Sequence, residues 1–299
     1  MRGPMTLGHA FQALWAIVAR ELMKFSRQTG RLVSALVRPL LWLAVFAAGF
    51  RNVFGMAIAE PYDTYISYDV YIAPGLIGMV LLFNGMQSSL AMVYDREMGL
   101  MRLLLTAPLP RWWILFAKLC ATAVLSLAQA LAFVVVAWLI GTELPLLGTG
   151  SEASAWHLPH VLLAAVSAAL MLGALGLLLS VYVKQLENFA GTMNFVIFPM
   201  YFMSTALYPL WKLEESGAGW VYQIARFNPF THAVEWLRYA LYGKDPGWSP
   251  WVVLATLAIC FFAASWGYDP QRGFGALTKR GGGPAGGGPV GGPPAKVGG

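Results

Sequence analysis

A group of charged side chains between two long apolar runs lies within YDREMGLMRLLLTAPLPRWWILFAK, residues 94–118. It holds two acidic and four basic groups: Asp95, Glu97, Arg96, Arg102, Arg111 and Lys118. Side chains of these types can form ion pairs or hold the charged surface of another protein. Because apolar runs long enough to cross a bilayer lie on both sides, the basic excess places the stretch on the cytoplasmic side of a membrane.

The same stretch carries the signals of a short helix. Asp95 is a predicted N-cap, and apolar residues recur with helical spacing from Met98 to Leu105. Pro108 ends the helix, because proline lacks an N–H and forces its predecessor out of the α region. The pattern predicts an amphipathic helix across the cytoplasmic mouth of two membrane helices, suited to receive force from a soluble partner. An ordinary polar loop is the alternative.

No group of residues in the sequence has the spacing of a catalytic or metal site. The four histidines are dispersed, and the two cysteines lack CxxC spacing. The phosphate-binding pattern GxxxxGK[ST] does not occur, nor do paired carboxylates within the apolar runs. We therefore expect neither enzyme chemistry nor a cofactor in this chain, and any ATP hydrolysis would have to come from another polypeptide.

The composition is that of a protein built for lipid. Of the 299 residues, 58% are hydrophobic and 11% are charged, whereas soluble domains have about 25% charged residues. A helix from His9 to Gln28 has a basic face opposite an aromatic face, which suits the cytoplasmic interface. We expect an all-α integral membrane protein with six transmembrane helices, at about residues 32–53, 71–93, 112–140, 158–183, 188–206 and 250–268.

The distribution of basic residues sets the orientation of these spans. With both termini in the cytoplasm, the inner segments hold fifteen of the twenty Lys and Arg residues. The net charge of +6 is therefore explained by the basic residues of the cytoplasmic segments, and no nucleic-acid partner is expected. Arg38, near the inner end of the first span, is expected to extend its guanidinium to the lipid headgroups.

The predicted spans carry two further patterns, one of small residues and one of polar residues. Ala165, Ala169 and Gly173 form a stripe of small residues, which predicts close approach of another helix. Polar residues recur with helical spacing in the second span and in the fifth: Asn84, Gln87 and Ser88, then Asn188 and Thr192. They suit either hydrogen bonds between helices or the lining of a substrate path.

The region after the fifth span is too broken for a simple membrane helix. Pro199 and Pro209 interrupt the apolar stretch FPMYFMSTALYPL. Asn228-Pro229 then begins a second amphipathic helix, because Asn is a good N-cap and Pro is favoured at the first helical position. Within this helix Glu235 and Arg238 lie at i and i+3 and are expected to pair.

Three of these stretches, in this order between six spans, resemble the permease subunits of ABC-2 type exporters. They are Asp95-Arg96-Glu97 with the following LLLTAPLPRWWILFAK, the broken stretch 198–210, and Asn228-Pro229-Phe230-Thr231 through Leu237-Arg238 to Gly243. The resemblance covers about residues 20–268. It implies an N-terminal segment with an interfacial helix (1–30) and a transmembrane domain (31–270) with a re-entrant region between the fifth and sixth spans. Residues 271–299, rich in Gly and Pro, lie outside it and are expected to be a disordered cytoplasmic tail.

The resemblance also implies partners. These are a second permease copy or a paralogue, a separate cytoplasmic ABC ATPase subunit, and the surrounding membrane lipids. A coupling helix within residues 94–110 would contact the ATPase through Asp95, Arg96, Glu97, Arg102 and Thr106. The expected function is ATP-driven export of a lipid-like, drug-like or glycan substrate across a bacterial inner membrane. The alternative is a membrane scaffold subunit that moves no solute.

Overall fold

The computed structural model describes residues 7–27, 29–50, 68–99, 110–141, 157–183, 185–215, 217 and 219–268. The expectations for Arg102, Thr106, Pro108 and the tail (271–299) lie outside the described residues. The described part is all-helical, as predicted. In chain order its helices are α1 (Leu7–Ser26), α2 (Thr29–Phe50), α3 (Tyr68–Glu97), α5 (Arg111–Leu139), α6 (Leu158–Tyr182), α7 (Leu186–Phe202), α8 (Leu210–Glu215), α9 (Gly219–Phe227), α10 (Pro229–Leu241) and α11 (Ser249–Gly267).

Four of the described helices are long and apolar enough to cross a membrane: α3, α5, α6 and α11. Two further helices, α2 with 22 residues and α7 with 17, stand where the first and fifth spans were predicted. The amphipathic helix predicted at the N-terminus is α1. The protein is therefore an integral membrane protein built from helices.

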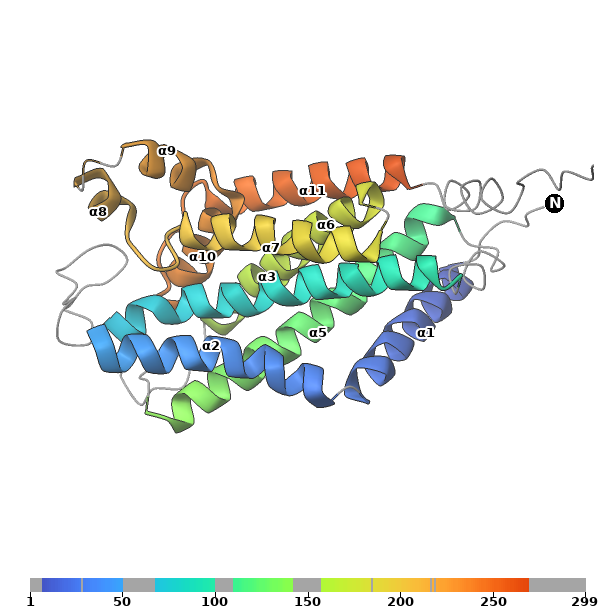
Figure 1. Ribbon diagram of the computed structural model, residues 1–299, viewed down its shortest axis with the longest axis horizontal. Helices are drawn as coiled ribbons and strands as arrows, with labels where there is room; N and C mark the ends of the chain where they lie inside the picture. The colour runs from blue at the N-terminus through green and yellow to red at the C-terminus, as the bar shows by residue number, and fades with distance from the viewer. Residues whose placement is uncertain are drawn as a thin grey trace, which may run out of the picture. The chain divides into compact units, whose positions relative to one another are not determined.

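Helices α3 and α6 occupy the centre of the packed core. α3 packs against α2, α5, α6, α7 and α10, and α6 packs in addition against α11 (Figure 1). Leu76 and Leu82 of α3 and Leu172 of α6 are fully buried. Because lipid tails are as apolar as leucine, such helices are held together by close packing and hydrogen bonds rather than by the hydrophobic effect.

The backbones of α3 and α6 touch where the two helices cross. A Cβ built on Gly85 would lie 2.9 Å from the carbonyl oxygen of Leu172, and one built on Gly176 would lie 2.8 Å from that of Gly85. Gly173 of the predicted small-residue stripe faces α5 instead, since a Cβ built on it would lie 2.8 Å from a methyl carbon of Leu119. The prediction that this stripe admits a neighbouring helix is confirmed.

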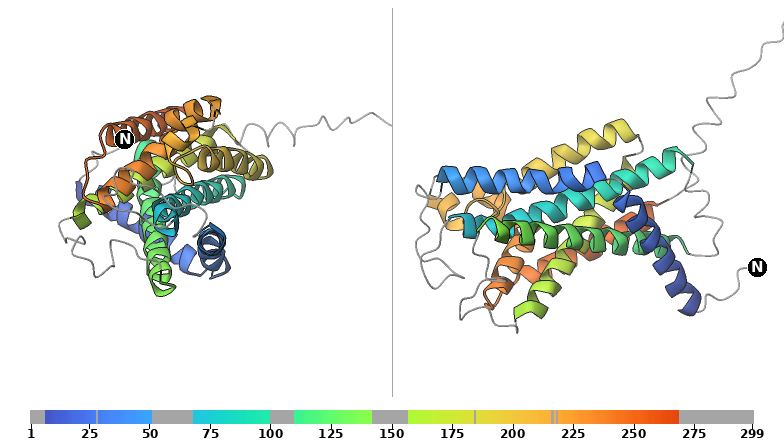
Figure 2. Two further views of the ribbon diagram at one scale, coloured as in Figure 1. Left: turned by 90° about the vertical axis from the view of Figure 1, so that its left-hand side faces the viewer. Right: turned by 90° about the horizontal axis from the view of Figure 1, so that it is seen from below.

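The short helices and α1 lie at opposite ends of the spanning helices. Figures 1 and 2 show α8 and α9 beyond the start of α3, and α1 beside the start of α5. α10 begins as predicted, since the side-chain oxygen of Asn228 accepts the N–H of Phe230 at 3.0 Å. Gly243 follows α10 with φ +64°, a conformation that favours glycine at the end of a helix.

One predicted helix start is wrong. α3 continues through Glu97, so Asp95 lies in its last turn instead of capping a separate helix. Helical hydrogen bonding runs on past it, since the Met98 N–H donates to the Tyr94 carbonyl at 3.0 Å. The reason is tertiary: the Asp95 carboxylate is buried against basic side chains from other helices, and these offset its weak preference for a helix interior.

The position of the break after the fifth span also differs from the prediction. Pro199 lies inside α7, which ends at Phe202, and the irregular backbone runs from Met203 to Pro209. Proline is tolerated inside membrane helices, because neighbouring groups satisfy the carbonyl that it leaves free. The two short helices that follow, α8 and α9, were not predicted.

Candidate functional site

Asp95 is the centre of a buried charge cluster at the end of α3. It is 3% exposed and forms ion pairs with three cations on two other helices. Lys118 of α5 lies 3.2 Å from Oδ2, Lys24 of α1 lies 3.1 Å from Oδ1, and Arg20 of α1 lies 3.8 Å from Oδ2. A buried carboxylate needs such partners, because removing a charge from water is costly unless it is paired and hydrogen-bonded.

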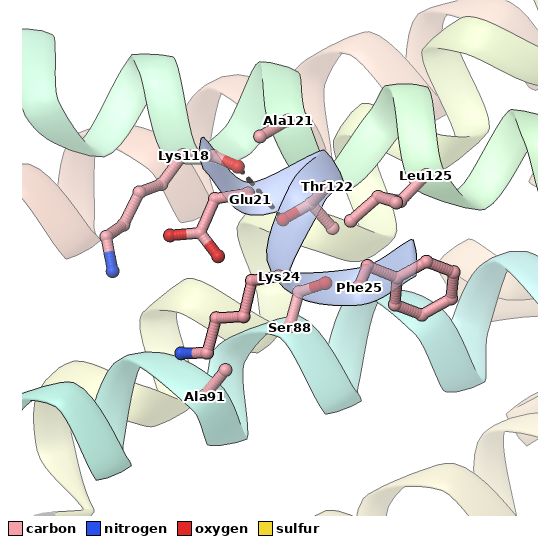
Figure 3. Close-up of a pocket in the computed structure, with 9 residues that line it drawn as sticks. All are labelled: Glu21, Lys24, Phe25, Ser88, Ala91, Lys118, Ala121, Thr122 and Leu125. Carbon is pink, nitrogen blue, oxygen red and sulfur yellow. Dashed lines mark hydrogen bonds between the residues drawn. The ribbon is translucent and has the colours of Figure 1, made fainter. Parts of the chain in front are cut away.

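A small cavity adjoins this cluster between α1, α3 and α5. Its volume is about 30 Å³, room for about one water molecule. Figure 3 shows its polar lining, with the Lys24 and Lys118 side chains and the Glu21 carboxylate on the charged side and Ser88 and Thr122 beyond them. α1 is therefore attached to the spanning helices through charged and polar side chains.

The next two residues, Arg96 and Glu97, bind the turn between α6 and α7. The Arg96 guanidinium donates to the carbonyl oxygen of Val183 at 2.9 Å, and the Glu97 carboxylate accepts the N–H of Leu186 at 2.8 Å. Leu186 begins α7, so Glu97 satisfies an N–H group that the helix itself cannot. Burial raises the pKa of Tyr268, just after α11, to about 12, although the positive charge of Arg96 opposes this shift.

Three consecutive residues thus join α3 to α1, α5 and the α6–α7 turn. The sequence predicted their importance but not their partners. Sequence reasoning missed Lys24 and Lys118 as the partners of Asp95. The signal that could have found them is charge, because a carboxylate at the end of an apolar helix needs basic partners. Arg102 and Thr106, the other predicted contacts, lie outside the described residues.

Arg238 is the centre of a second cluster at the opposite ends of the helices. It is 2% exposed, and the predicted ion pair with Glu235 is present. Its guanidinium also donates to the Thr205 carbonyl oxygen at 2.8 Å and lies 4.2 Å from the ring centroid of Tyr71. Arg238 is therefore a core residue and not part of an exposed interfacial pair.

The irregular segment from Met203 to Pro209 is held by side chains from α3 and by Asn228. Tyr68 donates to the Leu207 carbonyl at 2.9 Å, and Asn228 donates to the Met203 carbonyl at 2.8 Å. A Cβ built on Gly75 of α3 would lie 2.5 Å from the Ala206 carbonyl oxygen, so only glycine admits this approach. Non-helical backbone at membrane depth needs partners of this kind, because lipid offers none.

The predicted polar positions of the spans are in different environments. On α3, Asn84 is buried and its amide nitrogen lacks a partner among the described residues, while Gln87 and Ser88 are half-buried. On α7, Asn188 is exposed and donates to Gln185 at 2.6 Å, and Thr192 donates to the Asn188 carbonyl at 2.8 Å. The exposed face of α7 continues outward with aromatic side chains: Phe195, Phe198 and Phe202.

The chain belongs to the ABC-2 type transporter family, whose model matches residues 12–242. That match includes both the Asp95 and the Arg238 clusters.

Named relatives agree with this assignment. The chain is 31% identical over 235 residues to the transport permease ycf38 of Porphyra purpurea, covering 78% of this chain and 75% of that protein. It is 24% identical over 266 residues to the inner membrane transport permease YadH of Escherichia coli, covering 88% and 96%. It is also 24% identical over 239 residues to the daunorubicin resistance ABC transporter permease protein DrrB1 of Streptomyces coeruleorubidus, covering 80% and 78%.

Proposed function

We propose that this protein is the membrane-spanning subunit of an ATP-driven exporter. Six helices, α2, α3, α5, α6, α7 and α11, would cross a bacterial inner membrane with both termini in the cytoplasm. Two copies, or one copy and a paralogue, would enclose the substrate path, and a separate ABC ATPase would bind ATP and Mg²⁺. The family membership and the positive-inside charge distribution support this proposal.

The observation that supports the coupling step is the set of contacts that Asp95, Arg96 and Glu97 make with other parts of the chain. These residues immediately precede residues 98–110, which connect α3 to α5, and they bind α1, α5 and the α6–α7 turn. A displacement at this connection would therefore reach these three elements through ion pairs and hydrogen bonds. The ATPase can shift the permease between conformations only by contacting one of them more favourably than the other.

The exposure of the residues at the end of α3 narrows the surface that is predicted to contact the ATPase. Asp95 is buried and serves inside the permease, whereas Glu97 and Met98 are exposed at the end of α3. We expect the ATPase to contact the chain from Glu97 onward, including Arg102 and Thr106. Arg96 would act by holding the turn before α7 in place.

The substrate path is proposed to follow the exposed face of α7. Its inner half carries Asn188 and Thr192, and its outer half carries Phe195, Phe198 and Phe202. A lipid-facing helix gains nothing from exposed amides, so another protein surface or cargo is expected to cover this face. Gln87 and Ser88 on α3 are the further candidates for lining residues.

The test is purification of a tagged full-length chain in mild detergent, followed by transport measurements in sealed vesicles. We expect a soluble ATPase to co-elute in a fixed ratio, and its loss when residues 97–106 are replaced by a Gly-Ser segment of equal length. A chain that purifies without an ATPase while its dimer persists would contradict the exporter proposal and favour a scaffold.

A further inference from the structure

Arg38 of α2 is a charged side chain without a charged partner. Its guanidinium carbon lies 4.0 Å from the ring centroid of Phe83 on α3, and no carboxylate pairs with it within the described part of the chain. The side chain is also exposed. The predicted extension to the inner headgroups is not what the structure shows, because the guanidinium lies over a residue in the middle of α3.

The helix geometry gives the depth of this charge. Phe83 precedes Asp95 by twelve residues and follows Tyr68 by fifteen, which corresponds to about 18 Å and about 22 Å along α3. The hydrocarbon core of a bilayer is about 30 Å thick. If α3 crosses the membrane as proposed, the Arg38 guanidinium lies near the middle of the bilayer, where an ionised residue marks a functional site by default.

The described spanning helices hold no carboxylate at this depth that a second copy of the chain could supply. The sequences of α2, α5, α6 and α11 contain no Asp or Glu, and α3 contains none between Val70 and Tyr94. In α7 the acidic residue is Glu187, in its first turn. Beside Phe83, the buried Asn84 holds an amide nitrogen without a partner among the described residues, so a further donor lies at the same level. The described helices thus offer Arg38 no anion at this depth, and another molecule can supply one.

Exposed aromatic rings lie next to this charge. Trp42, one turn beyond Arg38 on α2, contacts Phe202 of α7 with ring centroids 5.7 Å apart. Phe202 in turn stacks on Phe198 at 6.1 Å, and these two phenylalanines are 41% and 48% exposed. A cationic group thus adjoins an open apolar surface that runs along α7.

We propose that Arg38 binds the anionic end of the transported molecule and that Trp42, Phe198 and Phe202 bind its apolar body. The cargo class is therefore an anionic amphiphile, with a phosphate or a carboxylate as the charged group. Both groups match the planar fork of a guanidinium, which binds two oxygens at once. This inference rests on the proposed export function.

The test measures binding to the full-length permease in nanodiscs of zwitterionic phosphatidylcholine, without the ATPase. Decyl phosphate, decanol and decyltrimethylammonium, each below its micelle concentration, are titrated while the melting temperature is followed. We expect decyl phosphate to bind at least tenfold more tightly than decanol, and decyltrimethylammonium to bind more weakly than either. Arg38→Gln should weaken decyl phosphate binding roughly tenfold to a hundredfold and leave decanol binding unchanged.

Two control variants separate charge from structure. Arg38→Lys should keep part of the preference for decyl phosphate, because it keeps the charge and loses the fork. Arg226→Gln, which removes an exposed arginine of α9, should keep all of it. An equal preference in Arg38→Gln and in the unchanged protein would overturn the proposal.

A final arm tests whether the anion is a bilayer lipid. In nanodiscs containing phosphatidylglycerol, unchanged affinity for decyl phosphate supports cargo as its source. Competition by phosphatidylglycerol that disappears in Arg38→Gln would identify a lipid headgroup as the occupant and overturn the assignment to cargo. Neither result depends on an ATPase, whose failure to co-purify would contradict the proposed function instead.

Discussion

The two ends of this protein are held together by different chemistry. At the end of α3, Asp95 is paired with Arg20 and Lys24 of α1, which are partly open to water, and with the buried Lys118 of α5. At the start of α3, Arg238, Tyr68 and Tyr71 bind backbone carbonyls of the irregular segment. Ion pairs with access to water can exchange partners, whereas buried backbone groups have no alternative partner in lipid. The Asp95 end is therefore the adaptable one, and the Arg238 end is fixed.

The largest effect should come from Arg238→Met. This change leaves the partly buried Glu235 without its cation and the Thr205 carbonyl without its charged donor. Removing one member of a buried pair costs about 3–5 kcal/mol. Thermal denaturation in detergent should show a large fall in melting temperature, with Arg226→Met as the control. A fall no larger than that of the control would contradict the assignment of Arg238 to the core.

A smaller loss of stability is expected from Asp95→Asn. Lys118, whose side chain is 8% exposed, would lose its anion, whereas Arg20 and Lys24 can turn to water. We expect a loss of about 3 kcal/mol, at the lower end of the range for a broken buried pair. The double variant Asp95→Asn with Lys118→Met should recover part of it, because no unpaired buried charge remains. Additive losses in this double-mutant cycle would show that the two side chains do not interact.

Combined Arg96→Gln and Glu97→Gln should separate stability from function. Both side chains are partly exposed, so the loss of stability should be about 1 kcal/mol or less. Transport should nevertheless fall several-fold, because the turn before α7 is no longer held to α3. Glu187→Gln, which removes an exposed carboxylate near the same turn, is the control. Transport at the unchanged rate would remove this pair from the coupling pathway.

The smallest expected effect concerns His232 of α10 at the fixed end. Its ring nitrogens lie 3.1 Å from the Arg226 carbonyl oxygen and 3.3 Å from the Ser249 hydroxyl, and burial lowers its pKa below the ordinary value of 6.5. The neutral ring is favoured in the folded protein, so its contribution to stability is complete above about pH 6.5 and is lost as the pH falls below it. His232→Gln should flatten the dependence of melting temperature on pH between about 5 and 7. An identical pH profile would mean that His232 ionises equally in both states.

Most of the helices could be predicted from the sequence, because long apolar runs and capping residues are local signals. Asn228 as an N-cap and the Glu235–Arg238 pair both follow from spacing along the chain. The predictions that failed concern contacts between residues that are distant in the sequence. Asp95 has the residue type of an N-cap, and only Lys24 and Lys118 keep it inside a helix. The binding of the irregular segment by Tyr68 could not be inferred, since no local pattern links residues that far apart.

The contact between α3 and α6 at Gly85 has a mechanical consequence. Because the two backbones touch there without intervening side chains, we expect this contact to be the point about which α3 tilts against α6. Asp95 and Gly75 each lie ten residues from Gly85, so the two arms of this lever are about 15 Å long. A tilt that carries Asp95 in one direction moves Gly75 and the Ala206 backbone beside it by about the same distance in the other.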